Sequence, residues 1–283
     1  MELIKAFQKG EALLDDIRQA VEDEHVFHTW WLGQSGFLIK WKKNFLLFDP
    51  YLSDSLTRKY ADTDKPHVRM GEWVIKPEQL DFIDVVTSSH NHTDHLDAET
   101  LLPLMEVNPE IKLIIPEANR AFVSNRLGCG TNLPVGLTQV GKTTVGPFTV
   151  HGVPAAHNEL DKDENGACLY MGYVAQFGKW SVYHSGDTLK YEGMEEVLAS
   201  FRPDIAFLPI NGNRPERRVA GNMGPEESAR LAKAIGAHTA IPHHFHMFTF
   251  NTEDPEKFVN ACNTVGQGHV VLRLGERFSF GTK

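Results

Sequence analysis

Residues 88–97 read Ser-Ser-His-Asn-His-Thr-Asp-His-Leu-Asp, and they directly follow an apolar run at 83–87. The run predicts a buried strand, so the polar stretch forms a loop at the end of that strand. This loop holds three histidines and an aspartate within six residues, namely His90, His92, Asp94 and His95. Chance would produce this spacing only about 0.002 times in a chain of such length and histidine content. We therefore expect the loop to be functional.

The spacing within the loop indicates metal binding at two places. Side chains two residues apart in an extended segment point the same way, so His90 and His92 can share one cation. Asp94 and His95 leave the turn in another direction, and neither pair supplies enough ligands alone. The alternative is a solvated polar loop with incidental histidines. We favour metal binding, because so dense a group of imidazoles is electrostatically unfavourable without a metal.

Composition limits the class of protein and its partners. A chain of 283 residues that is 41% hydrophobic and 10% aromatic is expected to be soluble and globular. The net charge of -9 and the lack of a basic tract argue against a nucleic-acid partner. Three cysteines without a C-x-x-C pair fit a reducing compartment. With neither a secretory signal nor a membrane span in the sequence, a cytoplasmic protein is expected.

The hydrophobic pattern predicts one α/β domain spanning residues 1–283. It begins with an amphipathic helix at about 2–24, and an antiparallel meander of strands follows at 26–32, 36–41 and 44–48. Residues 51–76 form a long polar loop, which is either a lid over a site or decoration. Further helices are predicted at 98–107, 117–127, 226–235 and 255–265. Further strands are predicted at 83–87, 111–115, 137–140, 147–153, 168–177, 180–184, 205–210 and 239–242, with a final hairpin of 269–274 and 277–280.

Polar residues follow several of the other predicted strands. Taken singly, each is more typical of a hydrogen-bonded turn than of a ligand. The loop at 88–97 nevertheless needs outside ligands to complete its coordination, and this need favours a site assembled from several strand ends. Asp187 is the candidate for a carboxylate that bridges two ions. The residues concerned are Asp49, His157, His184, Asp187, His243, His244 and His246.

Metal-assisted hydrolysis is the chemistry that fits these residues. Two divalent cations about 3.5–4 Å apart can share a hydroxide at neutral pH, polarise the bond to be broken and stabilise the resulting oxyanion. Histidine and carboxylate ligands without thiolate suit zinc, manganese or iron.

The same residues carry a resemblance to a known family. The motif His90-Asn-His92-Thr-Asp94-His95, with Asp49 before it and His157, Asp187 and His244 after it, resembles the motif series of the metallo-β-lactamase superfamily over nearly the whole chain. The resemblance implies an αββα sandwich of two mixed β-sheets flanked by helices, with the metals at one edge of the sheets.

Further motifs resemble one branch of that superfamily, which includes bacterial L-ascorbate-6-phosphate lactonase and is more distantly similar to phospholipase D enzymes acting on N-acyl phosphatidylethanolamine. They are Trp30-Trp-Leu-Gly33, Tyr183-His-Ser-Gly-Asp187, Leu208-Pro-Ile-Asn-Gly212, Gly221-Asn-Met223 and Ile241-Pro-His-His244.

The resemblance also implies roles for individual residues. One metal would be held by His90, His92 and His157, and the other by Asp94, His95 and His244. Asp187 would bridge the two ions, so that Asp94, Asp187 and His244 lie closest to the chemistry. Asp49 is expected to orient the loop rather than bind a metal. His184 is expected to support the site or to serve packing.

The chain departs from the family pattern near its last motif. Three histidines, His243, His244 and His246, stand where fewer are expected, and we select His244 by its place in the Ile-Pro-x-His pattern. His246 stands where relatives are expected to have an acid, so it is a candidate for substrate contact. Asn211, Arg214, Arg217 and Arg218 are further candidates. Guanidinium groups suit a phosphate or carboxylate, although a solvated basic turn explains these arginines equally well.

The expected function is the opening of a phosphorylated sugar lactone or a similar small ester. A metal-dependent phosphodiesterase is the first alternative, and a non-catalytic metal-binding protein is the second. The expected partner is a small-molecule substrate, and a phosphorylated lactone would make this substrate anionic. The sequence is also compatible with a homo-oligomer.

Overall fold

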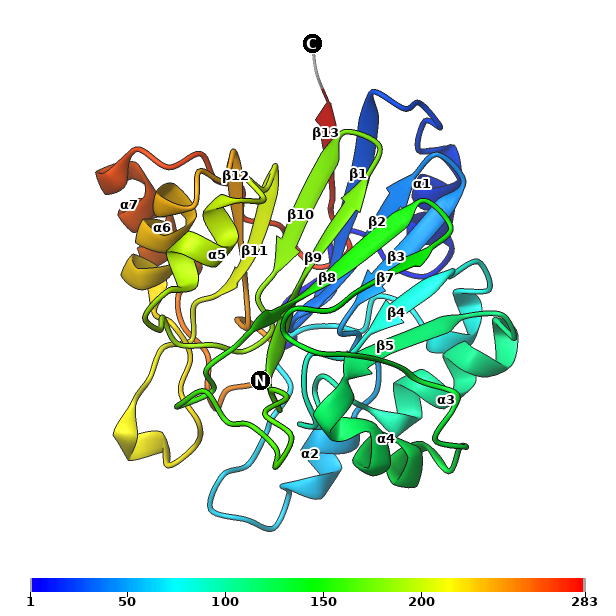
Figure 1. Cartoon of the computed structure of the whole chain (residues 1–283), viewed down its shortest axis with the longest axis horizontal. Helices are drawn as coiled ribbons and strands as arrows, with labels where there is room; N and C mark the ends of the chain where they lie inside the picture. The colour runs from blue at the N-terminus through cyan, green and yellow to red at the C-terminus, as the bar shows by residue number, and fades with distance from the viewer. Residues whose placement is uncertain (1, 282–283) are drawn as a thin grey trace.

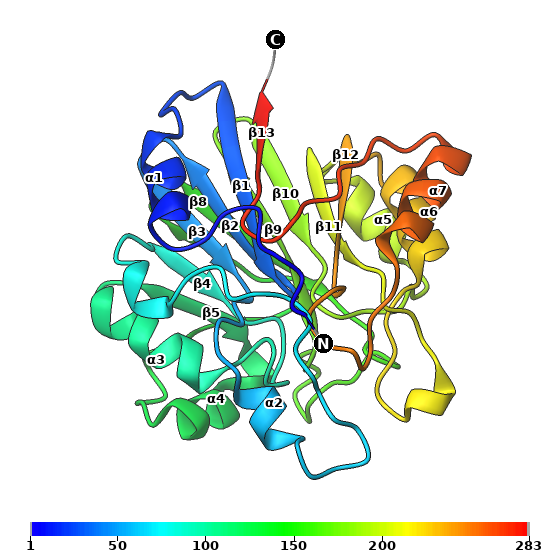
Figure 2. The ribbon, with the colours of Figure 1, turned by 180° about the vertical axis from the view of Figure 1, so that it is seen from behind.

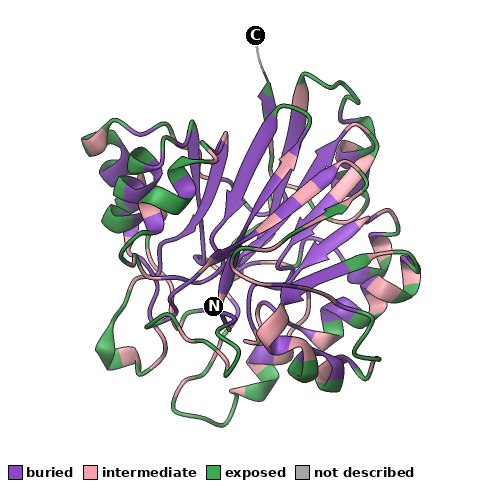
Figure 3. Cartoon of the chain, viewed as in Figure 1, coloured by how far each residue is buried: buried purple, intermediate pink, exposed green. Residues whose placement is uncertain are grey.

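Two β-sheets lie between two groups of helices in the computed structural model, which describes residues 2–281. Figures 1 and 2 show α5, α6 and α7 on one flank of the molecule, and α1, α3 and α4 on the other. Buried residues are concentrated in the strands, whereas the outer faces of the helices are exposed (Figure 3). The predicted sandwich of two mixed sheets is therefore confirmed.

The first sheet has the strand order β13-β1-β2-β3-β4-β5-β6. Neighbours from β13 to β3 are antiparallel, and neighbours from β3 to β6 are parallel. The predicted meander at 26–48 is thus confirmed. The strands are β1 (Val26–Gly33), β2 (Gly36–Trp41), β3 (Asn44–Phe48), β4 (Val85–Thr87), β5 (Lys112–Pro116), β6 (Val135–Leu137) and β13 (Arg277–Gly281).

The second sheet has the strand order β12-β11-β10-β9-β8-β7. It is antiparallel from β7 to β10 and parallel from β10 to β12. The strands are β7 (Lys142–Val145), β8 (Phe148–Pro154), β9 (Met171–Phe177), β10 (Trp180–His184), β11 (Ile205–Pro209) and β12 (Thr239–His243).

The helices agree with the prediction best where local signals are strong. The bounds predicted for α3 and α7 are confirmed, and α6 differs from its prediction by one residue. The helix α5 and the short α2 were not predicted. The α-helices are α1 (Glu11–Gln19), α2 (Ser55–Lys59), α3 (Ala98–Val107), α4 (Arg120–Leu127), α5 (Met194–Ala199), α6 (Pro225–Ala234) and α7 (Pro255–Val265), and single 3₁₀ turns lie at Pro77–Gln79, Glu117–Asn119 and Pro215–Arg217.

The predicted N-terminal helix at 2–24 is too long. Gly10 has a φ of 56°, a left-handed conformation in which a helix cannot continue, so α1 begins only at Glu11. Before it the chain is extended, and Ile4 forms a bridge with Gly71. The end of α1 is fixed by a buried lysine, because Lys40 Nζ donates to the carbonyls of Ile17 and Ala20 at 2.9 Å each. These tertiary contacts set the helix bounds.

Two predicted strands are also wrong. The final hairpin does not form, because β13 pairs with β1 and residues 269–274 are not a strand. Of the strand predicted at 137–140, only Leu137 lies in a strand, as the last residue of β6, and the residues after it form a turn closed by a hydrogen bond from Gly141 N to Thr138 O at 2.9 Å. Val140 is 89% exposed, so its apolar character did not indicate burial.

The main hydrophobic core contains residues from both sheets, including Trp30 of β1 and Phe207 of β11. Aromatic rings join the two layers, as in the stacked pair of Phe37 and Phe207, whose centroids are 3.9 Å apart. The three cysteines are free thiols. Among residues 2–281, every helix is too short or too polar to cross a membrane.

Candidate metal centre

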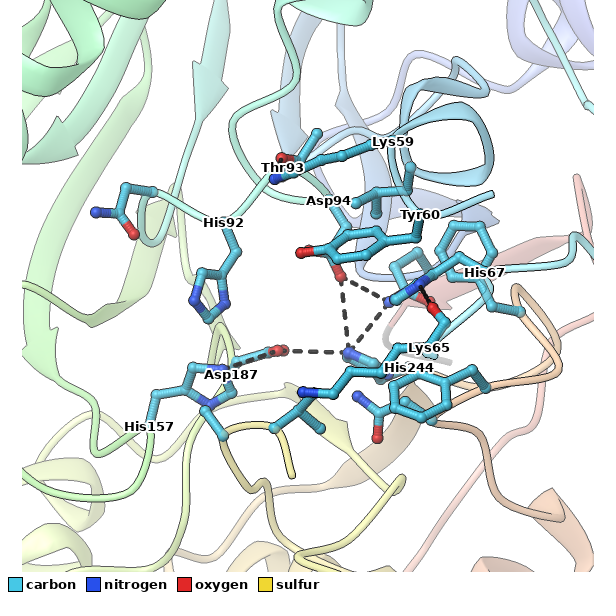
Figure 4. A pocket seen from close by; sticks show the side chains of 18 of the residues that line it. Lys59, Tyr60, Lys65, His67, His92, Thr93, Asp94, His157, Asp187 and His244 are labelled. Atoms are coloured by element: carbon cyan, nitrogen blue, oxygen red, sulfur yellow. Dashed lines mark hydrogen bonds and ion pairs between the residues drawn. The ribbon is translucent and has the colours of Figure 1, made fainter. Parts of the chain in front are cut away.

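The residues predicted to bind metal all follow strands that end at the same edge of their sheet. In the first sheet, β3 and β4 are parallel, so Asp49 and the loop at 88–97 lie at one edge. In the second sheet, β8 and β10 are both antiparallel to β9, and β10, β11 and β12 are parallel. The carboxyl ends of these strands place His157, Asp187 and His244 together. Figure 4 shows their side chains pointing toward those of His92 and Asp94.

Asp49 anchors the loop at 88–97. Its carboxylate accepts a hydrogen bond from Thr87 Oγ1 at 2.7 Å, and the backbone N–H of Ser89 donates to both of its oxygens at 3.1 Å. His95 Nδ1 donates to Asp49 Oδ2 at 2.7 Å. This bond fixes the tautomer of His95 and leaves Nε2 for a metal. Asp49 therefore has the position expected of a residue that orients the loop.

Asp49 is fully buried and remains charged. Burial alone would raise its pKa, but the hydrogen bond from His95 and the charges of His184 and His95 lower the pKa below its ordinary value. The carboxylate is therefore available as an acceptor for His95 at neutral pH.

The turn that carries Asp187 packs directly on the loop at 88–97. Gly186 has a φ of 58°, and a Cβ placed there would lie 2.6 Å from Ser89 Cβ and 2.7 Å from Met171 O. Only glycine fits this close approach. The residue after it, Asp187, is thereby brought to the histidines of the first sheet, with Oδ1 3.3 Å from His95 Nε2.

His157 and His244 approach Asp187 from the second sheet. His157 Nδ1 donates to Gly221 O at 3.0 Å, which leaves Nε2 at 3.9 Å from Asp187 Oδ2. His244 Nε2 lies 3.4 Å from the same oxygen and 3.7 Å from Asp94 Oδ2. All of the predicted ligands are thus brought together, and their roles as ligands remain a proposal.

The potential ligand atoms form three overlapping groups, in each of which they lie within 4.8 Å of one another. Asp187 belongs to two of the groups, as a bridging carboxylate would. The groups are His90 with His92 and His157, His90 with His95 and Asp187, and Asp94 with Asp187 and His244.

Several of these atoms are buried without a hydrogen-bond partner among the described residues. They include His90 Nε2, His95 Nε2 and Asp187 Oδ1. A buried polar atom without a partner is costly, and a cation among these atoms would remove the cost. Imidazole nitrogens and carboxylate oxygens are ligands for zinc, manganese and iron. The residues present therefore fit a metal centre.

The pKa values in the centre reflect the crowding of its charges. Burial, followed by the charges of His95 and His92, lowers the pKa of His90 well below its ordinary value. Burial and His157 lower the pKa of His92 to about 4. Both imidazoles are therefore neutral at pH 7, and a neutral imidazole is the form that binds metals. Burial also acts on His95, but Asp187 and Asp94 outweigh it and raise its pKa.

The three neighbouring histidines at the end of β12 have different surroundings. His244 faces the centre, as the motif predicts. His243 is buried away from it, with hydrogen bonds to Ser35 at 3.1 Å and Ser185 at 3.2 Å. His246 packs its ring against Phe245 and does not line the cavity. Only His244 of the three belongs to a potential metal-binding group among the described residues.

His184 packs behind the centre. Its ring stacks on those of Phe48 and His243, with interplanar angles of 9° and 6°. Its Nε2 donates to Ser35 O at 2.8 Å, and its Nδ1 accepts from the backbone N–H of Gly186. These contacts agree with the predicted role in packing and support.

Gln34 is a residue of this site that the sequence did not reveal. It lies in the turn between β1 and β2, and its Nε2 donates to Asp94 Oδ2 at 2.8 Å and lies 3.1 Å from His244 Nε2. The hydrophobic pattern predicts only that the chain connects two strands here. The signal that could have revealed Gln34 is its place at the end of β1. Because β1 and β3 are both antiparallel to β2, β1 ends at the same edge of the sheet as β3.

A cavity of ≈ 440 Å³ opens over the candidate ligands. Part of its wall comes from the segment predicted as lid or decoration, which contributes Leu56, Lys59, Tyr60, Lys65 and His67 (Figure 4). The structure thus favours a role at the site for this segment. A β-bridge between Arg69 and Phe248 holds this segment against the chain that follows β12.

The candidates for substrate contact are not in this cavity. Arg214 pairs with Glu253, and Arg218 pairs with Asp64. Their position outside the cavity and their carboxylate partners give no support to substrate contact by these arginines, which stays a prediction.

The remaining two candidates of this turn are also occupied by protein contacts. Arg217 donates to the carbonyls of Asn211 and Thr252, at 2.6 and 2.9 Å. Asn211 itself is fully buried and donates to Asn251 Oδ1 at 2.9 Å. These bonds hold the turn after β11 in place and indicate a structural role, while substrate contact by Asn211 and Arg217 stays a prediction.

A family model described as "Beta-lactamase superfamily domain" matches residues 44–245. The chain therefore belongs to the metallo-β-lactamase superfamily. It is 27% identical over 239 residues to a UPF0173 metal-dependent hydrolase of Caldivirga maquilingensis, covering 83% of this chain and 89% of that protein.

Solved structures show the same fold. The metallo-beta-lactamase fold protein YhfI from Bacillus subtilis aligns with a TM-score of 0.64 at 18% identity, over 90% of this chain and 100% of that one. The isothiocyanate hydrolase from Delia radicum gut bacteria aligns with a TM-score of 0.70 at 19% identity, over 90% and 100% of the two chains.

Proposed function

We propose that this protein is a metal-dependent hydrolase that uses two divalent cations at the edge of its two sheets. The observation that carries the proposal is the overlap of the three ligand groups at His90 and Asp187, each of which belongs to two groups. Overlap of this kind fits two neighbouring ions better than one. The naming of relatives as metal-dependent hydrolases supports the same activity.

Two bound cations would supply a nucleophile at neutral pH and a Lewis acid for the substrate oxygen. The chain would hold them through His90, His92 and His157 on one side and through Asp94, His95 and His244 on the other, with Asp187 between. Asp49 keeps His95 in the tautomer that presents Nε2. Gln34 orients the Asp94 carboxylate by donating to Oδ2, the oxygen that lies 3.7 Å from both His95 Nε2 and His244 Nε2.

The proposed substrate is a small lactone, with a phosphorylated sugar lactone as the first choice, or a related ester. The motifs that resemble the L-ascorbate-6-phosphate lactonase branch support ester chemistry. A cavity of ≈ 440 Å³ suits a small molecule better than a polymer. Both sheets contribute residues to the site, which supports one hydrolase domain. The cytoplasmic location and the oligomeric state stay predictions.

The test combines metal analysis with a panel of substrates. Purified protein loaded in turn with zinc, manganese or iron is expected to bind two ions per chain and to hydrolyse lactones. Turnover of phosphodiesters but not of lactones would replace the proposed activity with phosphodiesterase activity. Metal binding without turnover of either class would support a non-catalytic metal-binding protein, and so would a measured activity that Asp94→Asn together with His95→Ala leaves unchanged.

A further inference from the structure

Three basic side chains line the cavity beside the candidate metal ligands. Lys59 is the last residue of α2, Lys65 lies in the loop that follows, and Arg126 lies in the last turn of α4. They come from two separate parts of the chain and line the same cavity. Lys59 and Lys65 are visible at the rim of the cavity in Figure 4.

None of these three cations forms an ion pair within residues 2–281. Lys59 Nζ donates to Thr93 Oγ1 at 3.3 Å, and Lys65 Nζ donates to the backbone carbonyl of Arg218 at 2.6 Å. Arg126 Nη1 donates to the carbonyls of Asn91 and Leu96 in the ligand loop. Hydroxyl and carbonyl partners orient a cation but do not neutralise its charge.

The arginines of the turn after β11 provide an internal comparison. Arg214 and Arg218 have carboxylate partners, whereas the three cavity cations have none among the described residues. The acidic side chains that line the cavity are Asp94 and Asp187, and both belong to the candidate metal centre. The wall therefore keeps an excess of positive charge in a chain whose net charge is -9. Such a wall attracts anions.

Aromatic side chains line the same cavity. Tyr60 stacks on His67 with centroids 4.4 Å apart, and the rings of Phe248 and Phe250 lie 5.1 and 5.2 Å from His67. Phe122 also lines the cavity and lies under the guanidinium of Arg126. These rings offer flat apolar surfaces to the uncharged part of a ligand.

We propose that Lys59, Lys65 and Arg126 form an anion subsite, which binds a phosphate or carboxylate group carried by the substrate while the body of the substrate lies against the aromatic wall. Arg126 is the central member. Of its guanidinium nitrogens, Nη1 donates to the loop at 88–97, and a guanidinium can bind an oxyanion with two hydrogen bonds. The subsite rests on the proposed function, since it assumes that the substrate enters this cavity.

Binding of small aromatic ligands tests the subsite without any need for turnover. The probes are phenyl phosphate, benzoate and the neutral benzamide, titrated into metal-loaded protein by calorimetry. The two anions distinguish a phosphate from a carboxylate subsite. Tighter binding of at least one anion than of benzamide is expected. Arg126→Met, Lys65→Met and Lys59→Met are each expected to weaken anion binding, by about tenfold for Arg126, with benzamide unaffected.

The controls separate the subsite from the metals and from folding. Arg214→Met removes a guanidinium that is paired with Glu253 outside the cavity, and it is expected to leave anion binding unchanged. Metal content and thermal unfolding are measured for every variant, and the two lysine variants provide the test if Arg126→Met is unstable. An anion preference that is absent, or that survives in all three cavity variants, would overturn the subsite.

The same variants show whether the proposed function or the subsite has failed. If no lactone or ester is hydrolysed but the anion preference depends on these cations, the activity is wrong and the subsite stands. If turnover occurs, a matched pair of anionic and neutral esters is compared. The cavity variants are expected to raise KM for the anionic ester about tenfold, with kcat and the neutral ester little changed.

Discussion

The two sides of the candidate metal centre are held in place by different means. On the first sheet, the loop at 88–97 is bound from several directions. Asp49 accepts two hydrogen bonds from the backbone of Ser89, Tyr173 donates to Ser88 O, and Met171 N donates to Ser89 O. Because these bonds come from the protein itself, we expect this side of the centre to keep its shape without metal.

The side formed by the second sheet includes a residue with a strained backbone, whereas the loop at 88–97 has none. Buried atoms without a hydrogen-bond partner in the described part of the chain occur on both sides, at His90 Nε2 and His95 Nε2 of the loop and at Asp187 Oδ1 and His244 Nδ1 of the second side. His244 also has a φ of 62°, a backbone conformation that costs energy for a residue with a side chain. From this comparison we expect the loop at 88–97 to be preformed, and we expect bound metal to contribute to the order of the second side.

Loss of the bridging carboxylate is expected to have the largest effect. Asp187→Asn leaves an amide among the candidate ligands, and an amide nitrogen cannot bind a cation. We expect at least one metal to be lost, with turnover reduced on the order of 10³-fold. Metal analysis and initial rates provide the measurement. Full metal content in this variant would contradict the bridging role.

Metal removal addresses the comparison most directly. Metal that is present at 100 times its Kd stabilises the folded state by about 2.7 kcal/mol, so a chelator should lower the Tm. Hydrogen exchange should then increase more at 185–189 and 243–246 than at 88–97. Equal increases on both sides would show that the loop is not preformed.

Asp49→Asn tests the support of the loop. An asparagine accepts fewer hydrogen bonds than a carboxylate and no longer fixes His95, so metal affinity should fall about 10- to 100-fold. Thr87→Val is the matched control, since it removes one bond to the Asp49 carboxylate and one from the Asp49 backbone N–H but leaves the bonds from Ser89 and His95, so it should have a smaller effect. Metal titration of both variants decides the point, and unchanged affinity in Asp49→Asn would be evidence against the support.

Gln34→Leu should have a moderate effect. It removes the hydrogen bond to Asp94, which is worth about 1–3 kcal/mol when the acceptor is charged. We expect kcat to fall about tenfold, with most of the metal retained. The expected role in orienting Asp94 would be wrong if the variant keeps wild-type kinetics and metal affinity.

His243→Gln should have the smallest effect on the metals. His243 lies between Ser35 and Ser185 and stacks on His184, so the expected loss is about 1–3 kcal/mol of folding free energy. Chemical denaturation measures this loss. Metal content should match the wild type, in contrast to His244→Gln, and a similar metal loss in both variants would mean that the assignment of His244 alone is wrong.

Much of the fold could be predicted from the sequence because its signals are local. The spacing of apolar residues gave the bounds of α3 and α7, and Gly128 in a left-handed conformation ends α4 as expected. The histidine motif at 88–97 also lies within one short segment. Its spacing alone indicated a metal centre, because ligands from one loop need little tertiary information to be recognised.

Other features depend on contacts between distant residues, and only the tertiary structure decided them. The first turns of the predicted N-terminal helix are replaced by an extended segment that pairs with Gly71, and β13 adds to β1 instead of to its neighbour in sequence. Composition could not show that the cations after β11 are neutralised by Glu253 and Asp64.

Which of several adjacent residues faces the site also depends on contacts between distant residues. The sequence by itself determined which residue types gather at the strand ends. The packing of the sheets decided that His244 faces the centre while His243 is bound to Ser35 and Ser185, and that Gln34 reaches Asp94. The physical reason is that a side chain's neighbours across a sheet edge are set by strand order and backbone conformation, which no local pattern of residues contains.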